Sequence, residues 1–322
     1  MKNLRVLLNK PEYFFQPRQF LKRLKRGASF VSKSRPEILL PFGLPLTINP
    51  NETIGHSLWH LGIYDLAMSE TLWRLLDTEE TAWDVGANIG YVTGLMAKRV
   101  GQSGRVVAFE PHPDLFSHLE THVRHWERQY PIGKATLFQA AVADVGPDAN
   151  KGIQTRFKLV IPSEFSKNSG LSYIADETSD AESTFKNSAT KNRNKEQTID
   201  VSVLSLQQTL LKTEHSPQVL KIDTEGTELS VLKSGGDLIS PNGIRDILFE
   251  DHGIFPTPTQ QYLLERGYRV FAIQKNFTGP SLVEPPRPTR KSKWEPPNYL
   301  ATLNSERALS RLRSKGWKVL KG

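Results

Sequence analysis

The chain has 322 residues, which allows one large domain with attachments or two small domains, and its 38% hydrophobic content is enough for an ordinary core. Because it holds no cysteine, disulfide bonds, thiol catalysis and cysteine-based zinc sites are excluded. Its net charge of +8 suggests an anionic partner, but the distribution of that charge limits the inference.

The basic excess lies in an N-terminal arm, residues 1–36, which holds ten Lys or Arg residues and one acid, Glu12. This arm carries a net charge of +9, so the rest of the chain sums to −1. Within it, Gln19–Arg26 alternates apolar and basic residues at helical spacing. We expect an amphipathic helix that packs on the body with its basic groups solvated, and contact with an anionic membrane surface stays open.

The apolar runs of the arm are short and broken by charge or proline, unlike those of a secretory signal peptide. No stretch of the sequence has the roughly 20 apolar residues that a transmembrane helix needs. We therefore expect a cytoplasmic protein without a signal peptide or membrane span, with peripheral membrane contact through residues 1–36 as the open alternative.

The body of the chain begins with a helical preamble, residues 37–80, in which loosely periodic apolar residues predict one helix over Ser57–Leu76. From residue 81, short apolar strands alternate with helical stretches, which predicts a mostly parallel sheet with helices on both faces. Seven strands are predicted: Thr81–Val85, Arg105–Phe109, Ala135–Ala141, Gln218–Ile222, Ile244–Phe249, Tyr268–Ile273 and Asn298–Leu303. The helices of this domain, residues 81–303, are expected up to Val100 and over Pro113–Trp126, Thr227–Lys233 and Thr259–Arg266.

Two long stretches interrupt this alternation. Residues 145–200 form a polar insertion, and residues 276–297 hold six prolines and are expected to be extended loop. Such insertions usually cover an active site or are partly disordered. We expect Asn168–Tyr173 to be ordered near the site and Asp176–Gln197 to be largely mobile.

The C-terminal segment, residues 304–322, holds a basic amphipathic run, Ser305–Leu320. Its pattern predicts a single helix packed on the body.

The segment from Trp83 to Tyr91 ends a strand in an acid, Asp84, and continues through Gly86 and Gly90 into a helix. Glycine is needed where backbone comes close to a ligand, and folds of this kind bind nucleotides at the carboxyl ends of strands. The dinucleotide fingerprint G-x-G-x-x-G is absent. A carboxylate there would repel pyrophosphate but suits a ligand with ammonium and sulfonium groups. An ordinary strand-to-helix turn remains the alternative.

The next two strands also end in residues that suit a nucleoside. Glu110, before Pro111, can accept hydrogen bonds from both ribose hydroxyls. Ala141 leaves room for a flat adenine, and Asp144 is either a partner of the adenine amino group or a turn residue.

A third acidic run follows the fourth strand and contains Asp223, Glu225 and Glu228. Glu225 and Glu228 are three residues apart and share a helix face, and acids favour a helix start. Capping does not require an acid at Asp223, the last residue of the strand, so we expect its side chain to point into the crevice.

These motifs resemble the FkbM family of methyltransferases, which have the class I, Rossmann-like fold. The family pattern is D-V-G-A-N-I-G-x-x-T, then F-E-P, then K-I-D-x-E-G-x-E, then an acid after the fifth strand. This chain matches it at Asp84–Thr93, Phe109–Pro111, Lys221–Glu228 and Phe249-Glu250, so the resemblance runs from about residue 80 to 273. It departs at Ser205-Leu206-Gln207, where the family has T-L-D.

The resemblance implies S-adenosylmethionine as methyl donor and O-methylation of a hydroxyl on a sugar, a glycan or a natural-product-like small molecule. We expect donor contacts from Asp84, Gly86, Asn88, Gly90, Tyr91, Glu110, Pro111, Ala141, Asp144 and Asp223. A carboxylate would take the hydroxyl proton, with Asp223 as first candidate, Glu225 as second and Glu250 as third. Alternatively, Asp223 only orients the ammonium group of the donor.

No metal is expected. His118 and His122 are four residues apart, but no third ligand follows at useful spacing. We expect both, with His112 and His125, to face solvent.

Two other functions stay open. A nucleic-acid methyltransferase is suggested by the overall charge, but an acidic site would repel phosphate, so no nucleic-acid partner is expected. A non-catalytic donor-binding or partner-binding module is suggested only by Gln207. The sequence predicts neither the acceptor nor the oligomeric state.

Overall fold

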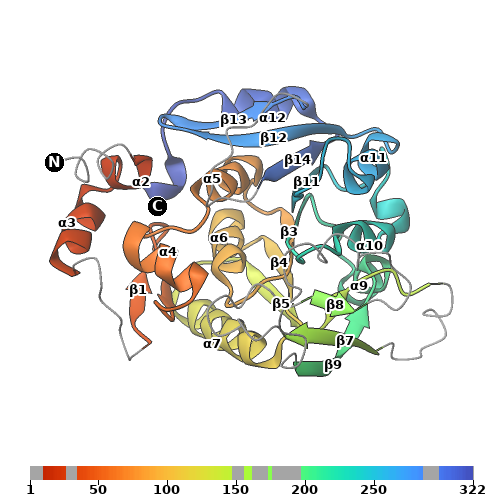
Figure 1. The fold of residues 1–322 in the computed structure, drawn as a ribbon, viewed down its shortest axis with the longest axis horizontal. Helices are drawn as coiled ribbons and strands as arrows, with labels where there is room; N and C mark the ends of the chain where they lie inside the picture. The colour runs from red at the N-terminus through yellow and green to blue at the C-terminus, as the bar shows by residue number, and fades with distance from the viewer. Residues whose placement is uncertain are drawn as a thin grey trace, which may run out of the picture.

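The computed structural model of the chain describes residues 10–26, 35–146, 156–161, 173–175, 197–285 and 297–321. Its centre is an eight-stranded sheet in the order β13-β12-β14-β11-β10-β3-β4-β5 (Figure 1). The strands are β3 (Thr81–Val85), β4 (Arg105–Phe109), β5 (Lys134–Phe138), β10 (Val219–Ile222), β11 (Asp246–Glu250), β12 (Arg269–Asn276), β13 (Gly279–Val283) and β14 (Asn298–Thr302).

Five adjacent strands, from β11 to β5, are parallel. The chain runs outward from β3 through β4 to β5 and returns with β10 on the other side of β3. The order of the strands therefore reverses between β3 and β10, and in such sheets the ligand crevice lies at the carboxyl ends of these strands. The predicted α/β, Rossmann-like fold is confirmed.

The predicted number of strands is one too low. Strand β13 lies inside the proline-rich stretch that was expected to be loop, and it forms an antiparallel hairpin with β12. Its Pro280 has no backbone N–H, but β13 is the edge of the sheet, where a missing donor is tolerated.

Helices cover both faces of the sheet (Figure 1). One face carries α5 (Leu66–Leu75), α6 (Tyr91–Val100) and α7 (Pro113–Gln129), and the other carries α9 (Leu206–Thr213), α10 (Glu228–Lys233) and α11 (Pro258–Leu264). Side chains alternate along each strand, so Ala82 packs with the first set and Trp83 with the second. By the same alternation, Asp84 lies on the α6 side, where Lys221 is its direct partner in the β3–β10 register.

The preamble contains two helices, α4 (Thr53–Leu61) and α5, and not the single helix that was predicted. Gly62 ends α4 in the left-handed conformation, and the Asp65 side chain caps α5 by accepting from Met68 N at 3.0 Å. This break places Tyr64 and Asp65 in a loop. A short hairpin of β1 (Glu37–Leu39) and β2 (Pro45–Thr47) precedes α4.

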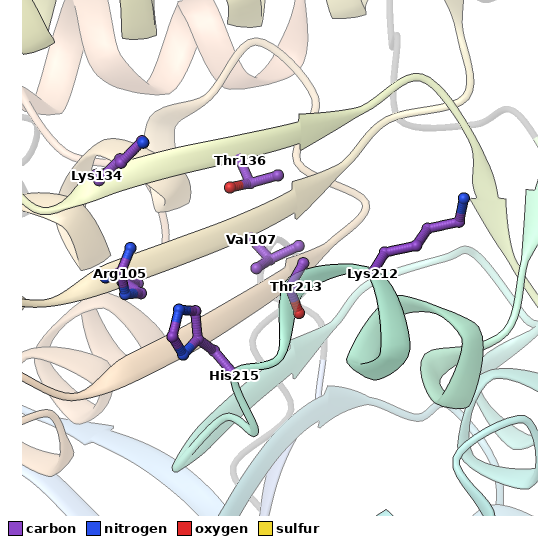
Figure 2. A pocket seen from close by; sticks show the side chains of 7 residues that line it. All are labelled: Arg105, Val107, Lys134, Thr136, Lys212, Thr213 and His215. Atoms are coloured by element: carbon purple, nitrogen blue, oxygen red, sulfur yellow. The ribbon is translucent and has the colours of Figure 1, made fainter.

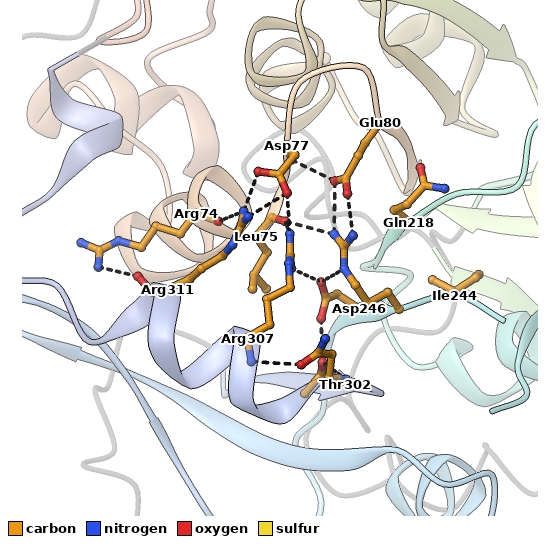
Figure 3. A network of polar contacts seen from close by, with 12 residues as sticks. Arg74, Leu75, Asp77, Glu80, Gln218, Ile244, Asp246, Thr302, Arg307 and Arg311 are labelled. Carbon is orange, nitrogen blue, oxygen red and sulfur yellow. Dashed lines mark hydrogen bonds and ion pairs between the residues drawn. The ribbon is translucent and has the colours of Figure 1, made fainter. Parts of the chain in front are cut away.

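The C-terminal segment packs on the body as expected, but α12 (Ser305–Leu312) ends well before the 3₁₀ turn η5 (Lys318–Leu320). Figure 3 shows how α12 is held. Arg307 bridges Asp77 at 2.9 Å and Asp246 at 3.1 Å, and Arg311 contacts Asp77 at 2.7 Å. Hydrogen bonds, first from Arg311, lower the pKa of Asp77 to about 2. This network joins the end of α5 to α12 and to the start of β11.

The polar insertion contributes a second sheet, which the sequence did not predict. It has four strands in the order β6-β9-β7-β8. These are β6 (Ala141–Val142), β7 (Arg156–Ile161), β8 (Tyr173–Ala175) and β9 (Gln197–Leu204). The expectations for Asn168–Tyr173 and Asp176–Gln197 fall on residues 168–172 and 176–196, which lie outside the described residues, while Tyr173 begins β8 and Gln197 begins β9.

The N-terminal arm forms α2 (Pro11–Phe14) and α3 (Pro17–Arg26). Within the described part of the chain, no helix has the length and apolar character needed to cross a membrane.

Candidate active site

The turn that follows β3 lies between the ends of β4 and β10. Gly86 has φ +78°, and a Cβ at this position would lie 1.9 Å from the carbonyl oxygen of Asp223. On the other side, Gly86 N and Ala87 N donate to Phe109 O at 3.1 and 2.9 Å. Only glycine therefore fits this conformation and this approach without moving the end of β10.

Glu110 follows β4 and is held against the same turn. Its Oε2 accepts from Asn88 N and its Oε1 from His112 N, both at 2.8 Å. Burial raises the pKa of Glu110 to about 7, although these two hydrogen bonds favour the charged form. Each carboxylate oxygen keeps a second lone pair. Glu110 thus has acceptors left for hydroxyl groups at the ends of the strands, and the neighbouring Pro111 is half-buried.

A buried ion pair lies beneath the turn. Asp84 is fully buried, with Oδ2 accepting from Thr93 Oγ1 at 2.6 Å and Oδ1 lying 3.2 Å from Lys221 Nζ. The same Nζ donates to Gly86 O at 2.8 Å and lies 3.5 Å from Asp223 Oδ2. Burial of Lys221 disfavours its charge, but Asp84 and then Asp223 outweigh this effect and raise its pKa. Lys221 therefore joins the turn of residues 86–90, which we call the donor turn, to the ends of β3 and β10, a role that sequence reasoning missed.

Two expected donor contacts are placed inside the fold. The Asp84 carboxylate is occupied by Thr93 and Lys221, and the Tyr91 side chain is buried with its hydroxyl 2.9 Å from Ser69 Oγ. Neither side chain lies at the open ends of the strands. The Asp84 carboxylate instead pairs with Lys221, which donates to Gly86 O in the turn, and the Tyr91 hydroxyl contacts Ser69 of α5.

Three carboxyl groups gather at the ends of β10 and β11, and we call Asp223, Glu225 and Glu250 the acid cluster. Burial, followed by the charges of Asp223 and Glu250, raises the pKa of Glu225 to about 8. Burial also raises the pKa of Glu250, opposed by a hydrogen bond from the mostly exposed His252, whose Nε2 lies 2.5 Å from Glu250 Oε1. All three candidate bases are therefore brought together by the fold.

Tyr64, in the α4–α5 loop, packs edge-on against Tyr91 and lies within reach of the charges of the acid cluster. Its pKa is raised well above the usual value, first by burial and then by the charge of Asp223. The neighbouring Asp65 accepts from Asn298 Nδ2 at 2.5 Å, and Asn298 is the register partner of Glu250. Because the sequence was expected to form one uninterrupted helix here, Tyr64 and Asp65 were not predicted to belong to the site. Gly62 and Asp65 are nevertheless a helix-stop and a helix-start signal.

Glu228 has a structural role in the loop between β10 and α10. Its Oε1 accepts from Thr224 N, Thr224 Oγ1 and Gly226 N at 3.0 to 3.1 Å. Burial raises its pKa despite these bonds. The loop that carries Glu225 is therefore fixed by Glu228.

Two further expected donor contacts, Ala141 and Asp144, follow the end of β5 along the chain. Ala141 is buried on β6. Asp144 is exposed, and its Oδ1 accepts from Gly146 N at 3.1 Å, which is the turn geometry that was the alternative for this residue. Its contact with adenine stays a prediction.

The departure from the family pattern falls at a helix start. Gln207 is exposed in the first turn of α9, beside Gly236. Ser205 and Gln208 form a full capping box there, so the helix keeps a good start without an acid.

The histidine expectations are wrong for two residues. His122 is buried, where Nε2 accepts from Thr47 N at 3.1 Å and Nδ1 lies 2.8 Å from Ile89 O. His112 is also buried, and its Nδ1 accepts from Asp114 N. His122 thus joins β2 to the turn after β3, and His112 caps the start of α7. The described residues contain no group of three or more potential ligands arranged to hold a metal ion.

A hollow of 170 Å³ lies elsewhere, towards the amino ends of β4 and β5 (Figure 2). Its lining is basic: it includes Arg105 and Lys134, the first residues of these strands, with Lys212 in the last turn of α9 and His215 just beyond that helix. It is therefore separate from the acid cluster at the carboxyl ends.

The chain is similar to a known protein family over the region that contains these motifs. The family described as the methyltransferase FkbM domain matches residues 84–270. No curated protein matches the chain. Among solved structures, a methyltransferase FkbM from Methylobacillus flagellatus KT is 14% identical, with a TM-score of 0.40. That match covers 70% of this chain and only 44% of the other.

Two further solved structures are similar to the chain with comparably low sequence identity and TM-score. An O-methyltransferase from Bacillus cereus in complex with SAH is 9% identical over 75% of this chain and 82% of its own, with a TM-score of 0.39. A SAM-dependent O-methyltransferase from Thermotoga maritima is 11% identical over 84% of this chain and 77% of its own, with a TM-score of 0.36.

Proposed function

Because the chain belongs to the FkbM family of S-adenosylmethionine-dependent methyltransferases, we propose that it methylates a hydroxyl group on a sugar, a glycan or a natural-product-like small molecule. The observation that carries this proposal is the acid cluster beside the donor turn, with Glu225 at a pKa of about 8. An alcohol loses its proton on methylation, and a carboxyl group with a raised pKa is a suitable acceptor.

The residues at the carboxyl ends of the strands fit the donor. S-adenosylmethionine carries ammonium and sulfonium charges, which suit an edge that holds Asp223, Glu225 and Glu250. When bound, it supplies an electrophilic methyl group. Glu110 has the free acceptors for the ribose hydroxyls, and the close turn at Gly86 allows the backbone to approach the ligand.

The contacts around the three candidate bases favour Glu225 over Asp223 as the general base. Lys221 Nζ, 3.5 Å from Asp223 Oδ2, partly compensates the charge of Asp223. We assign Asp223 to orienting the ammonium group of the donor. Glu225 is the base: its carboxylate would take the proton of the acceptor hydroxyl while the oxygen electron pair forms the bond to the methyl carbon, and the bond between that carbon and the donor sulfur would break to leave the neutral thioether. Tyr64 and Glu250 line the same space and position the acceptor.

Glu225→Gln is expected to lower kcat/KM for methyl transfer by about 10²–10⁴-fold, the usual contribution of a general base. In the wild type, Glu225 must be ionised to act. Its ionised fraction rises as the pH rises through its pKa of about 8, so kcat/KM should increase across that range. The measurement is label transfer from methyl-labelled S-adenosylmethionine at limiting acceptor, followed from about pH 6 to about pH 10, roughly two units on either side of this pKa.

Glu228→Gln is the matched control because it removes the same charge nearby while keeping an oxygen for the loop. The charge of Glu228 raises the pKa of Glu225, so the rising limb should remain and move to lower pH. A rising limb that persists unchanged in Glu225→Gln would exclude Glu225 as the base.

The acceptor class is tested by incubating the protein with labelled donor and a fractionated cell extract. Label in a glycan or a hydroxylated small molecule supports the proposal. Label in RNA would instead favour the nucleic-acid alternative, and donor binding without transfer to any fraction would favour a non-catalytic module.

A further inference from the structure

Helix α3 exposes its apolar residues to solvent. Leu21 is 56% exposed and Leu24 is 52% exposed. The two are three residues apart and therefore share a face of the helix. A surface helix of a globular protein normally turns this face to the core. An exposed leucine face therefore indicates a partner that is apolar.

The body is contacted by the opposite, more polar side of α3. Gln19 Nε2 donates to the backbone carbonyls of Trp59 and His60, each at 3.2 Å. Phe20, four residues before Leu24 and therefore at the edge of the apolar face, packs edge-on against Tyr13 of α2, with ring centroids 5.7 Å apart. The helix is thus oriented by Gln19 and Phe20 with its leucines turned outward. The helix packs on the body with Arg18, Lys22 and Lys25 exposed, as expected, but Leu21 and Leu24 also face solvent.

Basic residues flank the exposed leucines. Arg18 precedes Leu21 by three residues and Lys25 follows it by four, so both lie beside it on the helix surface. Helix α3 itself contains no acid. The single acid of residues 10–26, Glu12, is buried and paired with Lys275 Nζ at 2.9 Å. No negative side chain in this described segment offsets the exposed positive charge.

A second apolar patch lies on α2. Phe14 is 61% exposed and its ring is 5.1 Å from that of Phe277, at the turn between β12 and β13. Figure 1 places α2 and α3 together at the left end of the molecule, away from α10 and α11 at the right. Exposed phenylalanine and leucine among cations is the composition of helices that lie in the interface of a bilayer.

We propose that α2 and α3 dock this protein on a membrane surface that contains anionic lipid, through Phe14, Leu21 and Leu24 with Arg18, Lys22 and Lys25. The cations complement a negative surface, and the leucines enter the boundary of the acyl chains. A nucleic acid would use the cations but not the leucines. A second copy of the chain would oppose the same cations to one another. This inference does not depend on which acceptor the active site takes.

The test is co-sedimentation of the full chain with vesicles of phosphatidylcholine alone and of phosphatidylcholine with phosphatidylglycerol. We expect binding to the anionic vesicles that weakens as salt is added, because added salt screens the cations. Leu21→Ser with Leu24→Ser should weaken binding at least about tenfold. Lys22→Gln with Lys25→Gln should weaken it about tenfold and reduce the salt dependence.

Leu211→Ser is the matched control, because Leu211 is 78% exposed on α9, outside the proposed surface, and its loss should leave vesicle binding unchanged. All variants change exposed residues, so their melting temperatures should match that of the wild type. Absence of binding to anionic vesicles, equal binding to both vesicle types, or full binding by the double leucine variant would overturn the proposal. Dimerisation that the double leucine variant loses would instead assign the surface to a second copy.

Discussion

Gly86→Ala is expected to abolish binding of S-adenosylmethionine and to lower the free energy of unfolding. The new Cβ would lie 1.9 Å from the carbonyl oxygen of Asp223, at a φ of +78°. The left-handed conformation and the overpacking together cost about 2–5 kcal/mol. Relief of the clash requires the end of β10 to move, which displaces both Asp223 and the loop of Glu225. Calorimetric titration with the donor and thermal unfolding measure the two effects.

The control for this substitution is Gly43→Ala. Gly43 also has a positive φ, +87°, but a Cβ there would meet nothing within 4 Å. It should therefore show the conformational cost alone, about 1–2 kcal/mol, and bind the donor normally. Normal donor binding by Gly86→Ala would show that the turn does not form the donor site.

Lys221→Met is expected to be the most destabilising substitution at the site. It removes the cation 3.2 Å from Asp84, which is fully buried, and leaves that carboxylate without a compensating charge. Breaking a buried pair from one side typically costs 3–5 kcal/mol, and we expect about that loss in denaturant unfolding. It also removes the hydrogen bond to Gly86 O, so the donor turn should loosen and donor affinity should fall.

The double variant Asp84→Asn with Lys221→Met separates the effect of the unpaired Asp84 charge from the effect of the lost hydrogen bond to Gly86 O. Replacing both partners avoids the unpaired charge, so stability should recover in part relative to Lys221→Met alone. Donor affinity should stay low because the bond to Gly86 O is still absent. Additive losses in the double variant would show that Asp84 and Lys221 are not coupled in the folded protein.

The donor turn and the acid cluster could be predicted from the sequence because their signals are local. Gly86 and Gly90 follow β3, and Glu110 and Asp223 follow β4 and β10, the strands on either side of β3. Parallel strands bring these ends to one edge of the sheet, so chain order alone places the residues together. The same reasoning placed Asp84 at that edge, where strand alternation in fact turns its carboxylate inward to Lys221.

Features that depend on contacts between distant segments could not be predicted in this way. Tyr64 reaches the acid cluster only because Gly62 ends α4 and the chain turns towards β14. His122 has the periodicity of an exposed pair with His118, yet Thr47 and Ile89, from separate segments, make it a buried structural group. Strand β13 lies in a proline-rich stretch, and most of the second sheet comes from a polar insertion. In both stretches the alternation of apolar and polar residues that marks a strand is weak, so the sequence did not predict these strands.

The most direct test of the account is thermal unfolding with and without S-adenosylmethionine in the wild type and in Glu110→Ala, with Glu110→Gln as a milder variant. A donor at about 100 times its dissociation constant should stabilise the wild type by about 2.7 kcal/mol. Glu110→Ala should show no donor-induced shift, and Glu110→Gln, which keeps one oxygen acceptor, should show a reduced one. An equal shift in all three proteins would contradict the placement of the donor at the ends of β3 and β4.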